Sequence, residues 1–206
     1  MERKMVNKGK SSWNESAPGE LELLRRFLNT WKIPNDTRVP MDTLPGLLRD
    51  PSSWDKSFPG VPRGPGDDED LLVRLRDDLR GALDRPQGWE QLLNRWLGLY
   101  PVVARVANEA GEASVRYEPY PETGFAGWAA AVIAQAVKEG TWGRLKACPD
   151  CRWVFYDHTR SKSKVWCGMF AGDGGRACGT IAKVRRYRQR RRGDSSAGDS
   201  GEEGQP

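Results

Sequence analysis

The residues with the clearest chemical potential in this sequence are its four cysteines, all in the last third of the 206-residue chain. The first pair encloses only two residues, and a C-x-x-C pair forms a tight turn that directs two thiolates at one metal ion. The 15-residue gap to the third cysteine fits a pair of strands that folds back to deliver that ligand. No cysteine is left over. The pattern predicts one structural zinc ion with four ligands, Cys148, Cys151, Cys167 and Cys178.

Other uses of these cysteines are disfavoured. A thioredoxin-like redox pair needs a helix that starts at the motif, whereas the stretch after Cys151, Trp153-Val154-Phe155-Tyr156, has strand character. Disulfides are rare in a reducing cytoplasm, where we expect this chain because no apolar stretch follows the charged start to make a secretory signal. His158 is the one histidine and therefore the one alternative nitrogen ligand, but its polar neighbours predict a surface residue.

A strongly basic segment follows the last cysteine. Ile181, Val184 and Tyr187 recur at three-residue spacing, which predicts a helix with a narrow apolar stripe that rests on the zinc module. Unpaired guanidinium groups are costly to bury, so the rest of this helix must face solvent or an anionic partner. Arginine side chains match guanine edges and phosphate oxygens. The candidate DNA contacts are Lys183, Arg185, Arg186, Arg188, Arg190, Arg191 and Arg192.

Charge is distributed unevenly along the chain. Residues 141–192 contain 14 lysines and arginines and 3 acids, whereas the net charge of the whole chain is only +5. Residues 193–206 contain four acids and no base. Such clustering indicates an anionic partner, and DNA is favoured over RNA because a rigid helix fits the major groove. Two simpler explanations stay open: the basic segment only aids solubility, or the acidic tail neutralises it.

Helical patterns begin far upstream of the cysteines. Apolar residues at helical spacing predict a first helix from Leu21 to Trp31, ended by Pro34. Asp42 can cap a short second helix. Residues 51–70, rich in proline, glycine and aspartate, predict a loop.

The patterns that follow predict more helix and one pair of strands. Amphipathic helices are expected over residues 72–82 and from residue 89 to residue 97. Residues 102–106 and 113–117 predict a β-hairpin that turns near Gly111, with one face of its second strand in water. The stretch 125–137 is apolar on almost all sides and predicts a central buried helix.

Together these elements predict an α+β fold: a mainly helical N-terminal domain with a β-hairpin, followed by a small four-cysteine zinc finger that ends in a basic helix. The expected parts are a flexible arm at 1–16, the helical domain at 17–140, the zinc finger at 141–192 and a disordered acidic tail at 193–206. No apolar run is long enough to cross a membrane. Without a glycine-rich phosphate loop or a nucleophile elbow, and with one histidine, the chain is not expected to be an enzyme.

The C-terminal residues resemble the CGNR-type zinc finger of bacterial transcription regulators. The resemblance rests on Arg144-Leu145 before Cys148, on Trp153-x-Phe155-x-Asp157 with Arg160, on Trp166-Cys167-x-Met169, and on Cys178-Gly179 ahead of Lys183-Val184-Arg185-Arg186-Tyr187-Arg188. The upstream region is similar to the domain called ABATE, which usually precedes this finger, through Phe27-Leu28-Asn29-Thr30. Over residues 20–192 the resemblance implies a stress-related transcription regulator whose upstream domain senses a ligand.

Two features depart from the family pattern. The gap between the last two cysteines is long and includes Gly172-Asp173-Gly174-Gly175-Arg176, and Thr180-Ile181 replace the Asn-Arg of the family name. Zinc binding should survive, because a glycine-rich loop can span the longer gap. Any DNA contact made by the family's arginine is absent, although Thr180 can cap a helix start.

The sequence therefore predicts a zinc-dependent DNA-binding protein that regulates transcription. One alternative is a protein-interaction module whose basic helix docks an acidic partner. Another is a redox sensor whose zinc thiolates release the metal on oxidation.

Overall fold

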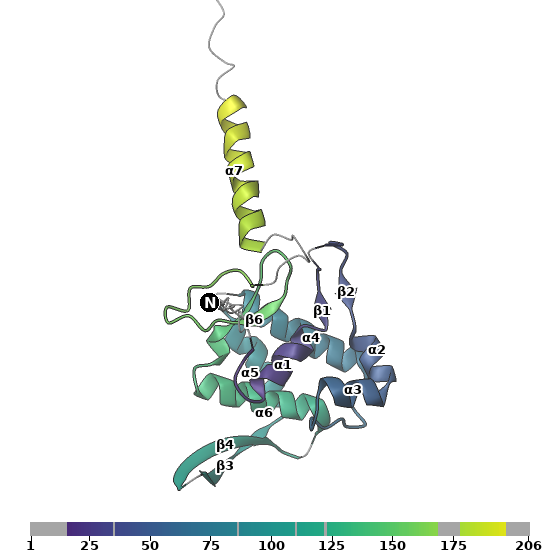
Figure 1. Cartoon of the computed structure of the whole chain (residues 1–206). Helices are drawn as coiled ribbons and strands as arrows, with labels where there is room; N and C mark the ends of the chain where they lie inside the picture. Colours follow the sequence, from purple (N-terminus) through teal and green to yellow (C-terminus); the bar gives the residue numbers. More distant parts are fainter. Residues whose placement is uncertain are drawn as a thin grey trace, which may run out of the picture.

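The computed structural model describes six stretches of the chain, 16–34, 36–85, 87–109, 111–121, 123–168 and 178–196, with only the backbone at residues 109 and 190–196. The elements in chain order are α1 (Leu21–Leu28), β1 (Trp31–Lys32), β2 (Met41–Asp42), α2 (Leu44–Arg49), α3 (Pro51–Ser57), α4 (Glu69–Asp84), α5 (Trp89–Leu99), β3 (Val102–Glu109), β4 (Glu112–Pro119), α6 (Gly124–Lys138), a 3₁₀ turn (Trp142–Arg144), β5 (Leu145–Ala147), β6 (Val154–Tyr156) and α7 (Cys178–Ser196). Helices α1 to α6 form the body, the β3–β4 hairpin extends from one end, and α7 projects from the opposite end (Figure 1).

The first helix is shorter than its apolar spacing predicts. Leu21, Leu24 and Leu28 face the core as expected, but α1 ends at Leu28. The carbonyl of Thr30 accepts a hydrogen bond from the Thr43 N–H at 2.8 Å, so the chain pairs with β2 instead of continuing the helix. Trp31 therefore lies in β1, opposite Asp42, and the prediction of a helix up to Pro34 is wrong.

The predicted loop over residues 51–70 is also partly wrong, because its first part is α3. The Asp50 carboxylate accepts from the Ser52 N–H at 3.1 Å, and Pro51 occupies the first helical position, where its missing N–H costs nothing. Trp54 and Phe58 then bury their rings against Phe125. This aromatic anchor on a distant helix outweighs the local preference of the segment for a loop.

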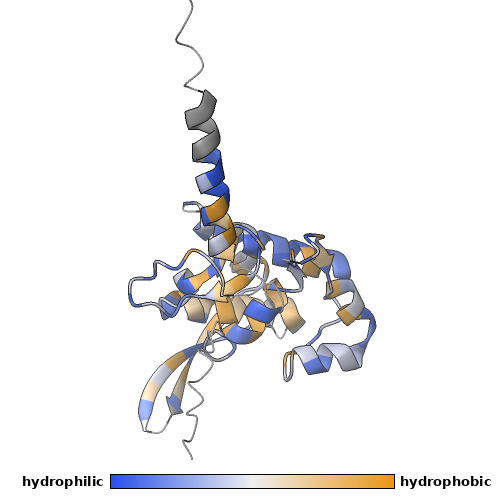
Figure 2. Cartoon of the chain, turned by 45° about the horizontal axis from the view of Figure 1, so that its top comes forward, coloured by the Kyte–Doolittle hydropathy of each residue, from blue (hydrophilic) through white to orange (hydrophobic). Residues whose placement is uncertain are grey.

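Helices α4 and α6 supply most of the core and match their predicted patterns. Leu72, Leu75 and Leu79 are buried along α4, which Asp68 caps by accepting from the Leu71 N–H at 2.8 Å. Helix α6 is buried over most of its length, and Figure 2 shows that apolar residues gather in the helical body. The buried carboxylate of Asp67 accepts from the first N–H groups of α6, which fixes its N-terminus.

The hairpin forms as predicted, with Val106 opposite Val115 and Gly111 in the turn at φ 90°. The sequence predicts that only one face of the second strand is in water, but the outer part of the hairpin is exposed to solvent on both faces. Val106 is 81% exposed and Val115 is 36% exposed. Strand β4 lies beside α6, but both strands also extend beyond the helical body (Figure 1), so this contact buries neither valine.

The core continues into the cysteine-rich region. Strands β5 and β6 are antiparallel, with Leu145 opposite Tyr156, and both residues belong to the same buried cluster as the helices. Helices and small antiparallel sheets thus form an α+β structure, as predicted. Within the described stretches, no helix is long and apolar enough to cross a membrane.

Candidate metal centre and the helix attached to it

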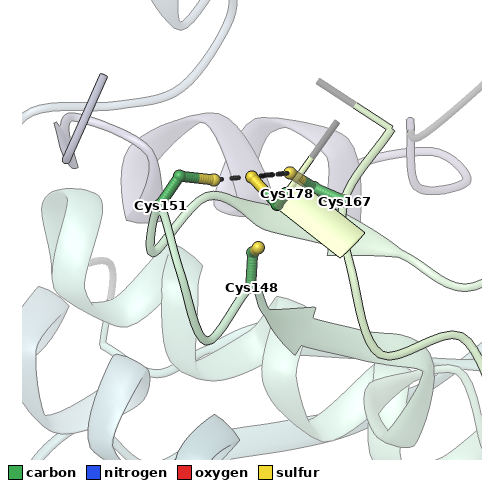
Figure 3. Close-up of side chains that lie close together, drawn as sticks. All are labelled: Cys148, Cys151, Cys167 and Cys178. Atoms are coloured by element: carbon green, nitrogen blue, oxygen red, sulfur yellow. Dashed lines mark hydrogen bonds between the residues drawn. The ribbon is translucent and has the colours of Figure 1, made fainter. Parts of the chain in front are cut away.

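The four cysteine sulfurs form one buried cluster. Their Sγ atoms all lie within 4.8 Å of one another, and Figure 3 shows them around a common centre. The Cys151 and Cys167 sulfurs are 3.3 Å apart, and the Cys167 and Cys178 sulfurs are 3.7 Å apart. A disulfide bond would be about 2.05 Å long, so these are free thiols.

This donor set fits zinc. Zn–S bonds of about 2.3 Å place the sulfurs of a tetrahedral site about 3.8 Å apart, close to the separations found here. Hydrogen bonds with neighbouring cysteines lower the pKa of Cys148, whereas the bond to Cys148 raises the pKa of Cys151 to about 12. Four crowded, buried sulfurs can all be thiolates only around a cation. Cys148, Cys151, Cys167 and Cys178 would hold the ion, and four thiolates leave no open position for a substrate.

The first pair of cysteines sits on the turn that joins β5 to β6. The Cys148 N–H donates to the Trp153 carbonyl at 2.8 Å, and the Arg152 N–H donates back to the Cys148 carbonyl at 2.9 Å. Arg152 closes this turn in a left-handed conformation with φ of 62°. The strand pair therefore presents the first two ligands. The prediction that a strand pair within residues 152–166 delivers Cys167 is wrong, because that segment contains β6 alone.

The one histidine does not approach the sulfur cluster. His158 is exposed, its Nε2 lies 2.8 Å from the Ser16 carbonyl oxygen, and its ring packs edge-on against Tyr156. The prediction of a surface histidine is thus consistent with its position. Phe155 is the aromatic residue buried among the cysteines, with Trp153 and Trp166 beside it.

Side chains from the N-terminal helical region hold the cysteine turn through hydrogen bonds to its backbone. This feature was not predicted from the sequence. Asn29 bonds both backbone groups of Val154, donating to its carbonyl at 2.8 Å and accepting from its N–H at 2.7 Å. Arg25 donates to the same carbonyl at 2.9 Å. Arg80 on α4 donates to the Arg152 carbonyl at 2.7 Å. Each bond satisfies a backbone group that the short β5–β6 pair leaves open.

Arg80 is unusual because it is buried with no carboxylate partner among the residues that the structure describes. Its guanidinium is held by the Leu28 and Arg152 carbonyls and lies 4.9 Å from the centre of the Trp31 ring. Burial, followed by repulsion from Arg152 and Arg76, lowers its pKa to about 10, so it stays protonated near neutral pH. A signal was present in the sequence: Arg76 and Arg80 are four residues apart on the apolar face of α4.

Asp150, between the first two cysteines, links the turn to two other elements. Its carboxylate is 6% exposed and pairs with Arg38, from the β1–β2 connection, at 3.2 Å. The same carboxylate accepts from Arg185 on α7, also at 3.2 Å. Asp150 therefore fixes the direction of α7 relative to the cysteine turn.

Helix α7 begins with a zinc ligand and then leaves the body. Cys178 is buried. The next residue, Gly179, lies so close to Trp166 that an added Cβ would be 3.2 Å from the ring. Ile181 and Val184 are half-buried, but Tyr187 is 61% exposed, so the predicted apolar stripe contacts the zinc module only along the first turns. From there α7 projects into solvent (Figure 1), and its described part turns hydrophilic (Figure 2).

The predicted DNA contacts are distributed along this projecting helix. Lys183, Arg186 and Arg188 are exposed, whereas Arg185 is exposed but paired with Asp150. The backbone at residues 190–192 continues the helix. The side chains of three further candidates lie outside the described residues: Arg190, Arg191 and Arg192.

Comparison with known proteins agrees with this geometry. Residues 144–191 match the family model of the CGNR zinc finger. A search of curated protein sequences found no match to the chain. The matched segment contains all four clustered cysteines. The predicted zinc-finger resemblance and the predicted cofactor, one structural zinc ion, are thereby confirmed.

Proposed function

We propose that this protein is a zinc-dependent DNA-binding protein that regulates transcription and that α7 is the element that enters the DNA groove. The observation that carries the proposal is that α7 starts at a zinc ligand and then projects with its cationic side chains exposed. Zinc fixes the start of the helix, and Asp150 restrains its direction through Arg185. A helix held in this way can be inserted into a major groove without a large supporting core.

The charge on α7 favours duplex DNA as the partner. Between Cys178 and Arg192 the sequence contains seven basic residues and no acid. The 19 residues of α7 make a helix about 28 Å long, close to one turn of B-DNA. Its Lys and Arg side chains would replace condensed counterions along the phosphates, which makes binding sensitive to salt.

The rest of the proposal concerns the upstream part of the chain. Residues 17–140 would act as an ABATE-like domain, between an arm at 1–16 and the finger at 141–192, with an acidic tail at 193–206. A cavity of about 650 Å³ between β4 and α6, with Trp128 in its wall, is large enough for a small effector. Four thiolate ligands leave the zinc ion no open position for a substrate, so we propose a regulator and not an enzyme. The protein would act in the cytoplasm.

Selection from bacterial genomic DNA fragments tests this proposal. We expect the zinc-loaded chain to enrich a shared sequence at physiological salt, as specific DNA-binding proteins do. A variant with Lys183, Arg186 and Arg188 changed to glutamine keeps every cysteine and should enrich nothing. The proposal would be contradicted if the protein bound all fragments weakly and bound another polyanion, such as heparin, equally well. That result would favour an acidic protein as the partner of α7.

A further inference from the structure

We propose that the loop between β6 and the third cysteine, residues 158–166 (the zinc loop), is a second DNA-binding element that contacts phosphates beside the groove occupied by α7. This inference rests on the proposed function and names a further part of the same interface. The residues assigned to phosphate contact are Arg160 and Lys162.

The backbone of the zinc loop is held firmly from the inside. The fully buried carboxylate of Asp157 accepts from the Thr159 N–H at 2.9 Å and the Thr159 hydroxyl at 2.6 Å with one oxygen, and from the Lys164 N–H at 2.9 Å and the Lys146 ammonium at 2.7 Å with the other. Arg144 donates to the carbonyls of Asp157 and Thr159. The loop is thus a preformed surface, and a partner would not have to order it.

These anchors leave two cations of the loop unused. Asp157 is neutralised by Lys146, and there is no acidic residue from position 158 to position 168. Arg160 and Lys162 are exposed, and in the described part of the chain neither side chain has an ion-pair or hydrogen-bond partner. Between them, the Ser161 hydroxyl lies 2.7 Å from the Ser163 hydroxyl, which adds polar hydrogens to the same rim.

The conformation of Lys162 is costly for a lysine. Its φ is 51°, in the left-handed region that glycine or asparagine adopts more readily, and it closes a turn by donating its N–H to the Thr159 carbonyl. Its side chain is exposed, and within the described residues no ion pair or hydrogen bond of that side chain offsets this cost. Backbone strain of this kind is often kept where a residue makes a functional contact, and we assign this contact to an external anion.

The zinc loop lies next to the base of α7. It ends at Cys167, whose sulfur is 3.7 Å from that of Cys178, the first residue of the helix, and Trp166 of the loop packs against Gly179. The loop extends sideways from the same end of the body from which α7 projects (Figures 1 and 2). With α7 in a major groove, a loop at its base faces the sugar–phosphate backbone at the edge of that groove. Phosphate contacts of this kind position a reading helix.

The salt dependence of DNA affinity tests the inference. Each phosphate contact contributes about 0.9 to the slope of log K against log salt concentration. The variant Arg160→Gln/Lys162→Gln should therefore lower this slope by about 2 and weaken binding to all duplex sequences alike. The variant Lys162→Gly keeps the left-handed turn, so it should lower the slope by about 1 while its Tm stays at or above that of wild type.

A matched control removes two charges elsewhere. Lys56 on α3 and Arg74 on α4 are exposed, and Lys56→Gln/Arg74→Gln should leave the slope at its wild-type value. An equal loss in this control, or an unchanged slope in the loop variant while α7 variants still reduce it, would overturn the inference and leave the proposed function standing. Absence of DNA binding by the zinc-loaded wild-type chain would overturn both. Binding of an acidic protein that depends on the loop, with no change in the DNA slope, would also overturn the inference.

Discussion

Asp157 shows how a single buried charge can organise the surface next to the zinc site. Burial alone would raise the pKa of its carboxyl, but hydrogen bonds from Lys146, from Thr159 and from the Lys164 N–H outweigh burial and lower it well below its ordinary value. The carboxylate is therefore ionised at all physiological pH values. Because four donors converge on its two oxygens, its removal would leave several of them unpaired.

Replacement of Asp157 by asparagine should destabilise the protein by about 2–4 kcal/mol, because an amide NH₂ would then face donors and Lys146 would lose its partner. Urea unfolding of the zinc-loaded protein measures this loss. Asp55→Asn, at an exposed position on α3, is the control and should change stability by less than about 0.5 kcal/mol. Equal stability of the two variants would contradict the role given to Asp157.

The comparison of wild type with Asp157→Asn also gives a prediction for the pH dependence of stability. A carboxyl with a lowered pKa in the folded state stabilises the protein fully above its unfolded pKa of about 3.9, and this contribution is lost as pH falls through the folded value. The stability difference between wild type and Asp157→Asn should thus be constant from about pH 5 to pH 7 and shrink below about pH 4. Taking the difference removes the effect of zinc loss, which both proteins share. A difference that grows on acidification would have the wrong sign.

At the scale of elements, the link between the cysteine turn and α7 depends on Asp150. Arg185 and Arg186 are neighbours on α7 and both are exposed, but only Arg185 is paired with this carboxylate. The two arginines therefore have different roles in the proposed complex. Arg185 positions the helix, whereas Arg186 is free to meet a phosphate.

Arg186→Gln should lower the salt slope of DNA binding by about 0.9, whereas Arg185→Gln should lower it less, because Asp150 already competes for that charge. Asp150→Asn should leave the total positive charge of α7 unchanged but weaken sequence-specific binding more than non-specific binding. Fluorescence anisotropy with a labelled duplex over a salt series measures all three. Identical slopes for the two arginine variants would remove the distinction between them.

Which elements the sequence could predict depended on where their partners lie. Helix α4 and the buried core of α6 follow from local apolar periodicity, and the cysteine cluster follows from spacing that a zinc ion constrains. The end of α1, the existence of α3 and the exposure of both faces of the hairpin do not follow, because distant contacts or their absence decide them. Likewise, Arg25 and Asn29 bond a carbonyl 129 and 125 residues away, and no local pattern in a single sequence carries that information.

At the scale of the whole molecule, the strands that carry the cysteine turn are part of the main core, and the cysteines form a second buried cluster beside it. Leu145, Val154 and Tyr156 are buried in the same cluster as the N-terminal helices, and β5 and β6 contact α4 and α1. Zinc removal should therefore destabilise the helical body as well as the finger. Asn29 and Arg80 bond to backbone groups of Val154 and Arg152. Without the metal, the turn would no longer hold these backbone groups in place for the two side chains.

Chelation of zinc should lower the Tm of the single unfolding transition by about 5 °C or more, since structural zinc contributes directly to folding free energy. Scanning calorimetry and far-UV circular dichroism of zinc-loaded and chelated protein measure this shift. A helical body that melts at the same temperature with and without zinc would show instead that the finger is an independent unit.

In our proposal zinc converts the basic C-terminal helix into an oriented DNA-binding element, and affinity for duplex DNA with and without zinc is the decisive measurement. We would measure binding of the full chain to a labelled duplex at physiological salt, zinc-loaded and chelated, beside Cys167→Ser and the control Lys56→Gln. We expect chelation and Cys167→Ser each to weaken binding at least tenfold, while Lys56→Gln binds like wild type. Equal affinity in all four samples would contradict it, because α7 would then bind as a polycation that needs no zinc.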